Sequence, residues 1–249
     1  MRKLVRFALR SVWLCAELLL INADFAWLSL RHGGAPPLRA RTRWLQRSCR
    51  RVLHLLSVEI EPDGPCPLDG LLVSNHLSYL DILVLATLTP AVFVSKSEVK
   101  HWPLFGWFAQ MGGTIFLRRE RRADVVRISA EIATVLRGGN LVVLFPEGTS
   151  SNGREVLPFR SSLLEPINGQ EHRLSVACLS YAVAGGSAEN DACYWGGMTI
   201  LPHLVKLLTK EQIRARVRFS MIERRADNRK ELARQLHAEV VRLKTTAAP

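Results

Sequence analysis

The sequence predicts an α/β fold, in which one α/β domain follows a helical N-terminal segment. From residue 68 onward, short apolar runs of strand length alternate with helix-like stretches, which is the pattern of α/β domains. The first 60 residues lack this alternation and are typical of two helices. The 249 residues suffice for one ordinary domain or two small ones, and an apolar share of 48% excludes a disordered chain. Because we find no internal repeat or flexible linker, we expect a single domain.

The first predicted element is a helix over residues 11–30, which follows four basic residues within the first ten. As an α-helix this mostly apolar stretch is about 30 Å long, which matches the hydrocarbon core of a bilayer. It also contains Glu17 and Asp24. Each acidic side chain costs about 2.5 kcal/mol or more at the bilayer midplane. These two residues disfavour a helix that crosses the membrane with all its sides exposed to lipid.

The charged residues around this helix recur every seven positions, so a helix places them along one stripe and leaves its remaining surface apolar. They are Lys3, Arg10, Glu17, Asp24 and Arg31. Such a helix lies in the membrane interface, or enters the membrane with its polar stripe against a partner helix. A cleaved signal peptide is the alternative, but no good small-residue cleavage site follows, and embedded acids are unusual in such peptides. We therefore predict membrane attachment.

A second helix, predicted over residues 39–56, is rich in arginine. Eight of the twelve net positive charges fall within residues 1–60, which contain 11 basic and 3 acidic side chains. A positive end beside an apolar stretch indicates an anionic membrane surface as the partner, with nucleic acid as the rival. The aromatic residues do not alternate with basic ones as a stacking platform for bases requires. We therefore expect a lipid surface and no nucleic acid as partner.

The five cysteines are scattered, odd in number and without a C-x-x-C pair. This pattern argues against a disulfide scaffold or a zinc ribbon and favours a reducing compartment. The histidines at 101, 172, 203 and 237 show no ligand spacing with cysteine or acidic residues. We therefore predict no metal site.

The remaining elements follow from the apolar pattern. We predict strands over 70–74, 91–95, 113–117, 140–145, 174–183 and 214–222. We predict helices over 79–88, 123–136 and 227–243. The organisation we expect is a basic, membrane-associating helical segment over residues 1–60 and a domain over residues 61–249.

A histidine and an aspartate lie five residues apart where a predicted strand passes into a helix. This places His76 at the exit of the strand and Asp81 early in the helix, where the chain can bring the two side chains together. A neutral imidazole accepts a hydroxyl proton at neutral pH, and a carboxylate on its other nitrogen fixes the tautomer. The pair is a candidate base and its orienting partner; the alternative is a histidine that caps the turn.

A polar loop follows the buried-looking strand that ends near Phe145, and it begins with Pro146-Glu147-Gly148-Thr149. Proline stiffens the exit of the strand, while glycine permits a close backbone approach or a positive φ. The exposed amides and hydroxyls of such a loop can hold a phosphate or a hydroxyl-rich head group.

Three motifs, in this order, resemble the first three motifs of the PlsC-like glycerolipid acyltransferase family, which includes the 1-acylglycerol-3-phosphate acyltransferases. They are Asn75-His76-x4-Asp81, Gly113-Thr-Ile-Phe116-Leu-Arg-Arg119 and Phe145-Pro-Glu-Gly-Thr149. The similarity covers roughly residues 70–205. It implies one domain of this family's type, with a central, mostly parallel sheet flanked by helices.

The resemblance implies transfer of a fatty acyl group from acyl-CoA or acyl carrier protein to a lysophospholipid hydroxyl, converting 1-acylglycerol-3-phosphate to phosphatidic acid. His76 is then the general base and Asp81 its orienting partner. The positions associated with acceptor binding are Arg119, Glu147, Gly148 and Thr149. Because a thioester is already activated and no cysteine or serine occupies a nucleophile motif, we expect direct attack by the acceptor, without cofactor or metal. The expected location is the cytoplasmic face of a membrane, the inner or plasma membrane in a bacterium.

Two alternatives stay open. Many phosphatidate-forming members carry an arginine directly after the third motif, where this chain has Ser150, and an arginine binds phosphate better than a hydroxyl does. The stretch Leu157-Pro-Phe-Arg-Ser-Ser162 resembles members that acylate lyso-ornithine lipid, so this lipid is the alternative acceptor. The alternative from another class is a non-catalytic basic protein that binds membranes or nucleic acid.

Overall fold

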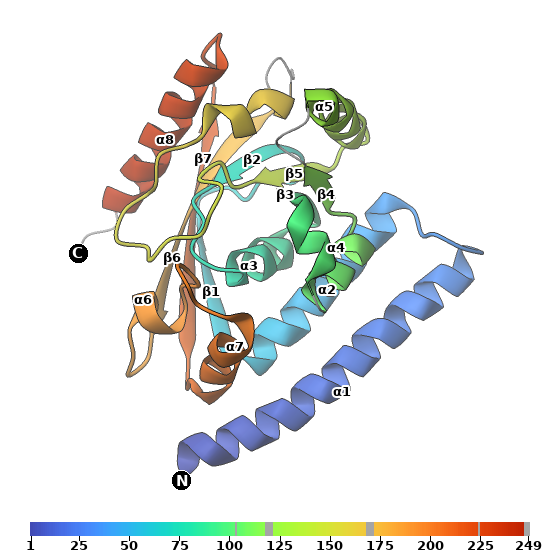
Figure 1. Cartoon of the computed structure of the whole chain (residues 1–249), viewed down its shortest axis with the longest axis vertical. Helices are drawn as coiled ribbons and strands as arrows, with labels where there is room; N and C mark the ends of the chain where they lie inside the picture. Colours follow the sequence, from blue (N-terminus) through green and yellow to red (C-terminus); the bar gives the residue numbers. More distant parts are fainter. Residues whose placement is uncertain (103, 118–121, 168–171, 224, 247–249) are drawn as a thin grey trace.

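A mostly parallel β-sheet forms the centre of the structure, a computed structural model that describes residues 1–102, 104–117, 122–167, 172–223 and 225–246. Within these residues the sheet has seven strands in the order β1-β7-β6-β2-β5-β3-β4. Neighbouring strands run parallel except β6 and β7, which pair antiparallel. The predicted α/β fold with a mostly parallel sheet is therefore confirmed (Figure 1).

The strands match the predicted ones, with one addition at the edge of the sheet. Their bounds are β1 (Val58–Asp63), β2 (Gly70–Ser74), β3 (Ala91–Lys96), β4 (Ile115–Leu117), β5 (Leu141–Leu144), β6 (Leu174–Val183) and β7 (Ile213–Ile222). Strand β1 was not predicted, because its short alternation of apolar and acidic residues is a weak signal. It pairs with β7, so the expected domain boundary after residue 60 falls inside a strand of the sheet.

Helices cover both faces of the sheet. Their bounds are α1 (Arg2–Arg31), α2 (Leu38–Leu55), α3 (Leu80–Leu88), α4 (Phe105–Gly112), α5 (Arg122–Arg137), α6 (Ala188–Asp191), α7 (Ile200–Thr209) and α8 (Arg229–Thr245). Three short 3-10 helices are η1 (Ser97–His101), η2 (Ser161–Leu163) and η3 (Glu165–Ile167) among the described residues.

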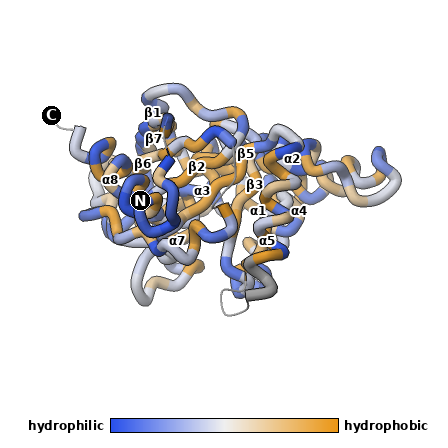
Figure 2. Tube along the Cα trace, turned by 90° about the horizontal axis from the view of Figure 1, so that it is seen from above, coloured by the Kyte–Doolittle hydropathy of each residue, from blue (hydrophilic) through white to orange (hydrophobic). Residues whose placement is uncertain are grey.

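Successive residues of the central strands point to opposite faces and so belong to two separate cores. In β2, Leu72 packs into the core shared with α1, α2, α3, α4 and α7, whereas Leu71 and Val73 pack into the core shared with α5 and α8. All three side chains are 0% exposed. Hydrophobic residues are accordingly concentrated along the central strands (Figure 2). Both layers therefore hold the carboxyl end of β2 in place.

Three residues of the predicted polar stripe of α1 contact the rest of the chain, whereas Lys3 and Arg31 near its ends are exposed. Glu17 and Asp24 accept hydrogen bonds from Arg51 of α2, at 2.6 and 2.9 Å. The buried guanidinium of Arg10 donates to the Ser57 hydroxyl and the Lys210 carbonyl. The partner helix expected for this stripe is thus α2 of the same chain, which lies beside α1 (Figure 1).

The opposite side of α1 is apolar and exposed. The large side chains there include Leu9, Val12, Leu19, Trp27 and Leu30, which are between 64% and 74% exposed. Within the described ranges, no helix combines the length and the apolar character needed to cross a bilayer. Helix α1 is therefore amphipathic: Arg10, Glu17 and Asp24 lie on the side that contacts the rest of the chain, and the outward side is apolar.

Several arginines of α2 bind the carboxyl ends of neighbouring helices. Arg39 donates to the Gly138 carbonyl at 2.7 Å, and Arg50 donates to the Thr87 carbonyl at 3.2 Å. The last carbonyls of a helix lack intrahelical partners and carry partial negative charge, which favours cations there. Part of the positive charge of the N-terminal segment therefore stabilises the fold.

Candidate active site

The first and third sequence motifs lie close together because the strands that precede them, β2 and β5, are parallel neighbours in the sheet. Val73 of β2 is in register with Leu144 of β5, so the loops that follow both strands leave the sheet at the same edge. This is the edge at which open α/β sheets bind ligands. The His76 backbone N–H donates to Oε1 of Glu147 at 3.2 Å. The first and third motifs are therefore one site in the structure.

His76 and Asp81 form a direct pair. Nδ1 of His76 lies 2.7 Å from Oδ2 of Asp81, which also accepts the backbone N–H groups of Leu77 (2.6 Å) and Ser78 (2.9 Å). Asp81 lies in the first turn of α3, where backbone N–H groups lack helical partners. Its carboxylate is 0% exposed, whereas the imidazole is 20% exposed. The aspartate caps the turn, and the histidine is oriented by it with one side accessible.

The imidazole is also held by an aromatic ring. Phe145, the residue after β5, stacks on His76 with a centroid distance of 4.2 Å and an interplanar angle of 21°. The backbone N–H of Ser151 donates to the His76 carbonyl at 2.9 Å. The ring plane and the backbone of His76 are thus both set by the loop that carries the third motif.

Glu147 lies inside this loop and not on its surface. Its side chain is 2% exposed, and burial raises the pKa of its carboxyl to about 8, an effect to which the charge of nearby Asp81 adds. Hydrogen bonds from the backbone amides of His76 and Leu157 partly offset the rise in this pKa. The carboxyl is therefore mostly protonated at neutral pH, and its contact is with the backbone of the histidine loop.

The other residues assigned to acceptor binding are placed unequally. Gly148 is buried and has φ +73°, which the turn requires and which glycine adopts without strain, while Thr149 is exposed. The hydroxyl of Ser150 donates to the Tyr194 carbonyl. Arg119 lies outside the described residues.

We expect Glu147→Gln to remove a pH dependence of stability. The folded-state pKa of about 8 exceeds the ordinary 4.5, so the native protein binds the proton more tightly than the unfolded chain between these values. The free energy of unfolding of the native protein therefore falls, on the order of a few kcal/mol, as pH rises through this window. Thermal unfolding at pH 6 and pH 9 should show a smaller difference in Tm for the variant. The matched control is Glu155→Gln, at an exposed carboxyl of the same loop, and an unchanged difference in the Glu147 variant contradicts the assignment.

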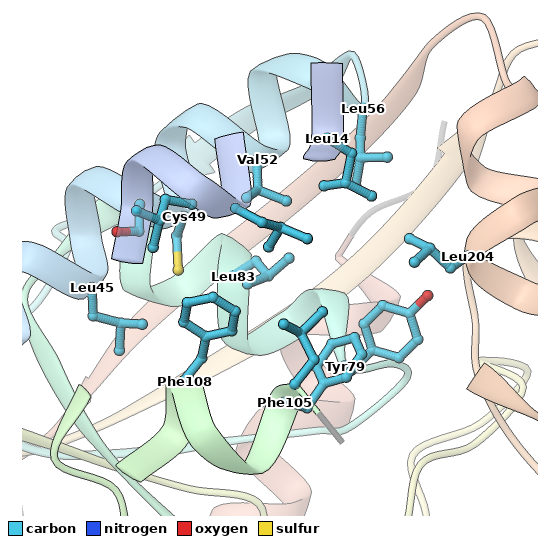
Figure 3. A pocket seen from close by; sticks show the side chains of 14 residues that line it. Leu14, Leu45, Cys49, Val52, Leu56, Tyr79, Leu83, Phe105, Phe108 and Leu204 are labelled. Atoms are coloured by element: carbon cyan, nitrogen blue, oxygen red, sulfur yellow. The ribbon is translucent and has the colours of Figure 1, made fainter. Parts of the chain in front are cut away.

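An apolar cavity lies beside the histidine loop. Its volume is about 120 Å³, and its walls come from α1, α2, α4 and α7 together with the start of α3. Figure 3 shows Leu45, Cys49, Phe108 and Leu83 along it, with Tyr79, three residues after His76, in its wall. The sequence did not reveal this cavity, because its lining residues are ordinary apolar positions that only the fold brings together.

Comparisons with known proteins show which family this chain resembles. A family model described as Acyltransferase matches residues 64–169. The lyso-ornithine lipid O-acyltransferase of Pseudomonas aeruginosa is 36% identical over 98% of this chain and 96% of its own. The 1-acyl-sn-glycerol-3-phosphate acyltransferase of Neisseria meningitidis is 35% identical over 61% of each chain.

A solved structure shares the fold. The crystal structure of the 1-acyl-sn-glycerophosphate acyltransferase PlsC from Thermotoga maritima superposes with a TM-score of 0.64 over 100% of both chains, at 17% sequence identity. The named activities of the relatives favour the enzymatic prediction over the non-catalytic alternative. This chain belongs to the PlsC-like glycerolipid acyltransferase family and is an O-acyltransferase of that type.

Proposed function

We propose that this enzyme transfers a fatty acyl group from a thioester donor to the hydroxyl of lyso-ornithine lipid. The observation that carries the choice of acceptor is Ser150, which occupies the position of a phosphate-binding arginine in many phosphatidate-forming members. Its hydroxyl donates a hydrogen bond to the Tyr194 carbonyl, so this position provides no positive charge to bind a phosphate. The relatives that match most of this chain support the same acceptor, since those from Pseudomonas and Brucella are named lyso-ornithine lipid O-acyltransferases.

The geometry of the pair supports direct transfer. Because Nδ1–H of His76 donates to Asp81, Nε2 is the nitrogen that accepts the proton of the acceptor hydroxyl. The hydroxyl oxygen then attacks the thioester carbonyl, the C–S bond breaks, and the proton passes from the imidazolium to the departing thiolate. The products are the acylated lipid and free CoA or carrier-protein thiol. The thioester is already activated, so the reaction calls for no further cofactor.

We also propose that the apolar cavity holds a fatty chain. Its lining is almost wholly hydrocarbon, with Ser48 and Tyr79 among the few polar residues, and each methylene transferred there from water contributes about 0.8 kcal/mol. The Tyr79 ring, which lies 5.2 Å from that of Phe105, connects the cavity wall to the histidine loop. A chain bound there places its carboxyl end toward the catalytic pair.

A purified-enzyme assay tests the proposed acceptor. With labelled acyl-CoA or acyl carrier protein, we expect lyso-ornithine lipid to be acylated at least tenfold faster than 1-acylglycerol-3-phosphate. Faster formation of phosphatidic acid identifies the phosphate-bearing lipid as the acceptor, which the relative from Neisseria favours. Comparing the two donors at equal concentration distinguishes CoA from carrier protein.

We propose that α1 binds the enzyme to the cytoplasmic surface of a membrane. Its outward side is apolar, and exposed aromatic side chains at Trp102 and Trp107 add to the hydrocarbon near the cavity. Basic residues at the start of α1 favour anionic lipids. The thioester donors and the free cysteines both suit a reducing, intracellular side.

Charging the outward side of α1 should weaken this attachment. Leu19 is 74% exposed on α1, and burying a leucine contributes roughly 1.5–3 kcal/mol, so Leu19→Glu is expected to lower vesicle partitioning about tenfold or more. Sedimentation with vesicles of phosphatidylcholine and phosphatidylglycerol measures the effect. The matched control is Leu68→Glu, in the loop before β2, where the leucine is 76% exposed and binding should not change. Equal partitioning of both variants shows that another surface makes the contact.

A further inference from the structure

The second oxygen of the catalytic aspartate has its own partner. Oδ2 of Asp81 accepts hydrogen bonds from His76 and from two backbone amides. Oδ1 accepts a hydrogen bond from the hydroxyl of Tyr181 at 2.7 Å. Tyr181 lies on β6 and is 9% exposed. Burial and the neighbouring Asp81 charge raise its pKa well above 10, so the hydroxyl stays protonated and donates to the carboxylate.

The position of this hydroxyl depends on the alignment of β6 with β2, and one side chain of the first motif, Asn75, helps to fix that alignment. Strand β6 has ten residues and β2 has five, so β6 continues past the carboxyl end of its neighbour (Figure 1). Asn75 extends the pairing beyond β2, since its amide group donates to the Leu179 carbonyl (3.0 Å) and accepts the Leu179 N–H (2.7 Å). Residues two apart share a face of a strand, so this register sets Tyr181 opposite Asp81.

We propose that Tyr181 is a positioning residue of the reaction, which holds Asp81 by Oδ1 so that Oδ2 stays aligned with Nδ1 of His76. This inference rests on the proposed function of the pair. The carboxylate is 0% exposed, and a rotation about its Cβ–Cγ bond would break the three hydrogen bonds to Oδ2. The hydroxyl prevents that rotation from the far side, and its hydrogen bond also stabilises the buried charge on Oδ1.

The groups that face the pair come from several elements. The Glu147 carboxyl of the β5 loop contacts the His76 backbone, and Lys244 of α8 acts on Glu147 through space. Cys193, which follows α6, lies near Asp81 and has its thiol pKa raised to about 12, mainly by burial. Glu189 of α6 acts on this thiol as well. Because Glu147 ionises near pH 8, the effect of a substitution on His76 is measured below about pH 7, where Glu147 stays protonated.

The test is Tyr181→Phe in the full-length enzyme. We expect kcat to fall about tenfold or more with KM values within twofold, because the loss affects alignment and not binding. The acidic limb of the pH profile of kcat/KM should move to lower pH, because a carboxylate that is no longer aligned with Nδ1 of His76 stabilises the imidazolium less. In an Asp81→Asn background the same substitution should have little further effect, since the two residues act as one unit. The matched control is Ser175→Ala, which removes a buried hydroxyl from the same strand and should change none of these values.

The outcomes distinguish a positioning role of Tyr181 from a structural one. A lowered kcat with an unmoved acidic limb, or additive losses in the Asp81→Asn background, assigns Tyr181 a purely structural role and overturns the proposal. So does a Tyr181→Phe enzyme with wild-type kcat. A wild-type protein without acyl transfer, or an active His76→Ala variant, instead refutes the proposed function. If Tyr181→Phe unfolds, as circular dichroism would show, then Asn75→Ala provides the second test. This substitution removes both hydrogen bonds to Leu179 without adding a charge beside His76, and it must also move the acidic limb if register sets the contact.

Discussion

His76→Ala lowers kcat by about a thousandfold, and this is the largest effect that we expect from a single substitution. A positioned general base contributes roughly 10²–10⁴ to the rate, and the carboxylate of Asp81 orients the imidazole for this role. The measurement is the initial rate of acyl transfer at saturating donor and acceptor. KM values should change little, because the imidazole acts on the proton and contributes little to holding the lipids.

The fold should tolerate this change. His76 is partly exposed, and its backbone contacts with Glu147 and Ser151 do not need the side chain. The matched control is His237→Ala on α8, since His237 also has a hydrogen-bond partner and an aromatic neighbour, Phe159, but lies outside the pair. We expect wild-type kcat for this control. Wild-type activity in the His76 variant would remove the proposed base.

Val52→Trp should lower kcat/KM for long-chain substrates by about a hundredfold. Val52 lines the cavity from α2, and an indole there displaces part of a bound chain (Figure 3). Excluding about four methylenes costs about 3 kcal/mol at roughly 0.8 kcal/mol each, which corresponds to two orders of magnitude. Short-chain substrates do not reach the filled region, so their kcat/KM should change less than about twofold.

Two substrate series show whose chain the cavity holds. If chain-length dependence is lost for donor thioesters only, the cavity holds the transferred acyl group; if it is lost for the acceptor only, the cavity holds the chain of the lyso-lipid. The matched control is Val241→Trp, because Val241 is likewise a partly buried helical valine, but it packs on the core at the other face of the sheet. An equal loss for short and long chains in the Val52 variant would show that the cavity does not bind hydrocarbon.

The α/β class, nearly every strand and the identity of the pair formed by His76 and Asp81 could be predicted from the amino-acid sequence. These features are local. A strand is recognised from the pattern of consecutive residues, and a five-residue spacing at the start of a helix brings an imidazole and a carboxylate together. The third motif was equally visible, since proline and glycine after a buried strand specify a sharp exit.

The folded chain was needed to identify the groups that surround that pair and the partner against which α1 packs. The hydroxyl that donates to Asp81 comes from Tyr181, a hundred positions along the chain, and Glu17 and Asp24 of α1 face α2 because both pair with Arg51. The buried position of Glu147 and the cavity likewise arise from packing between distant segments. Burial and long-range hydrogen bonds depend on the register of whole elements against one another, which a pattern of neighbouring residues does not encode.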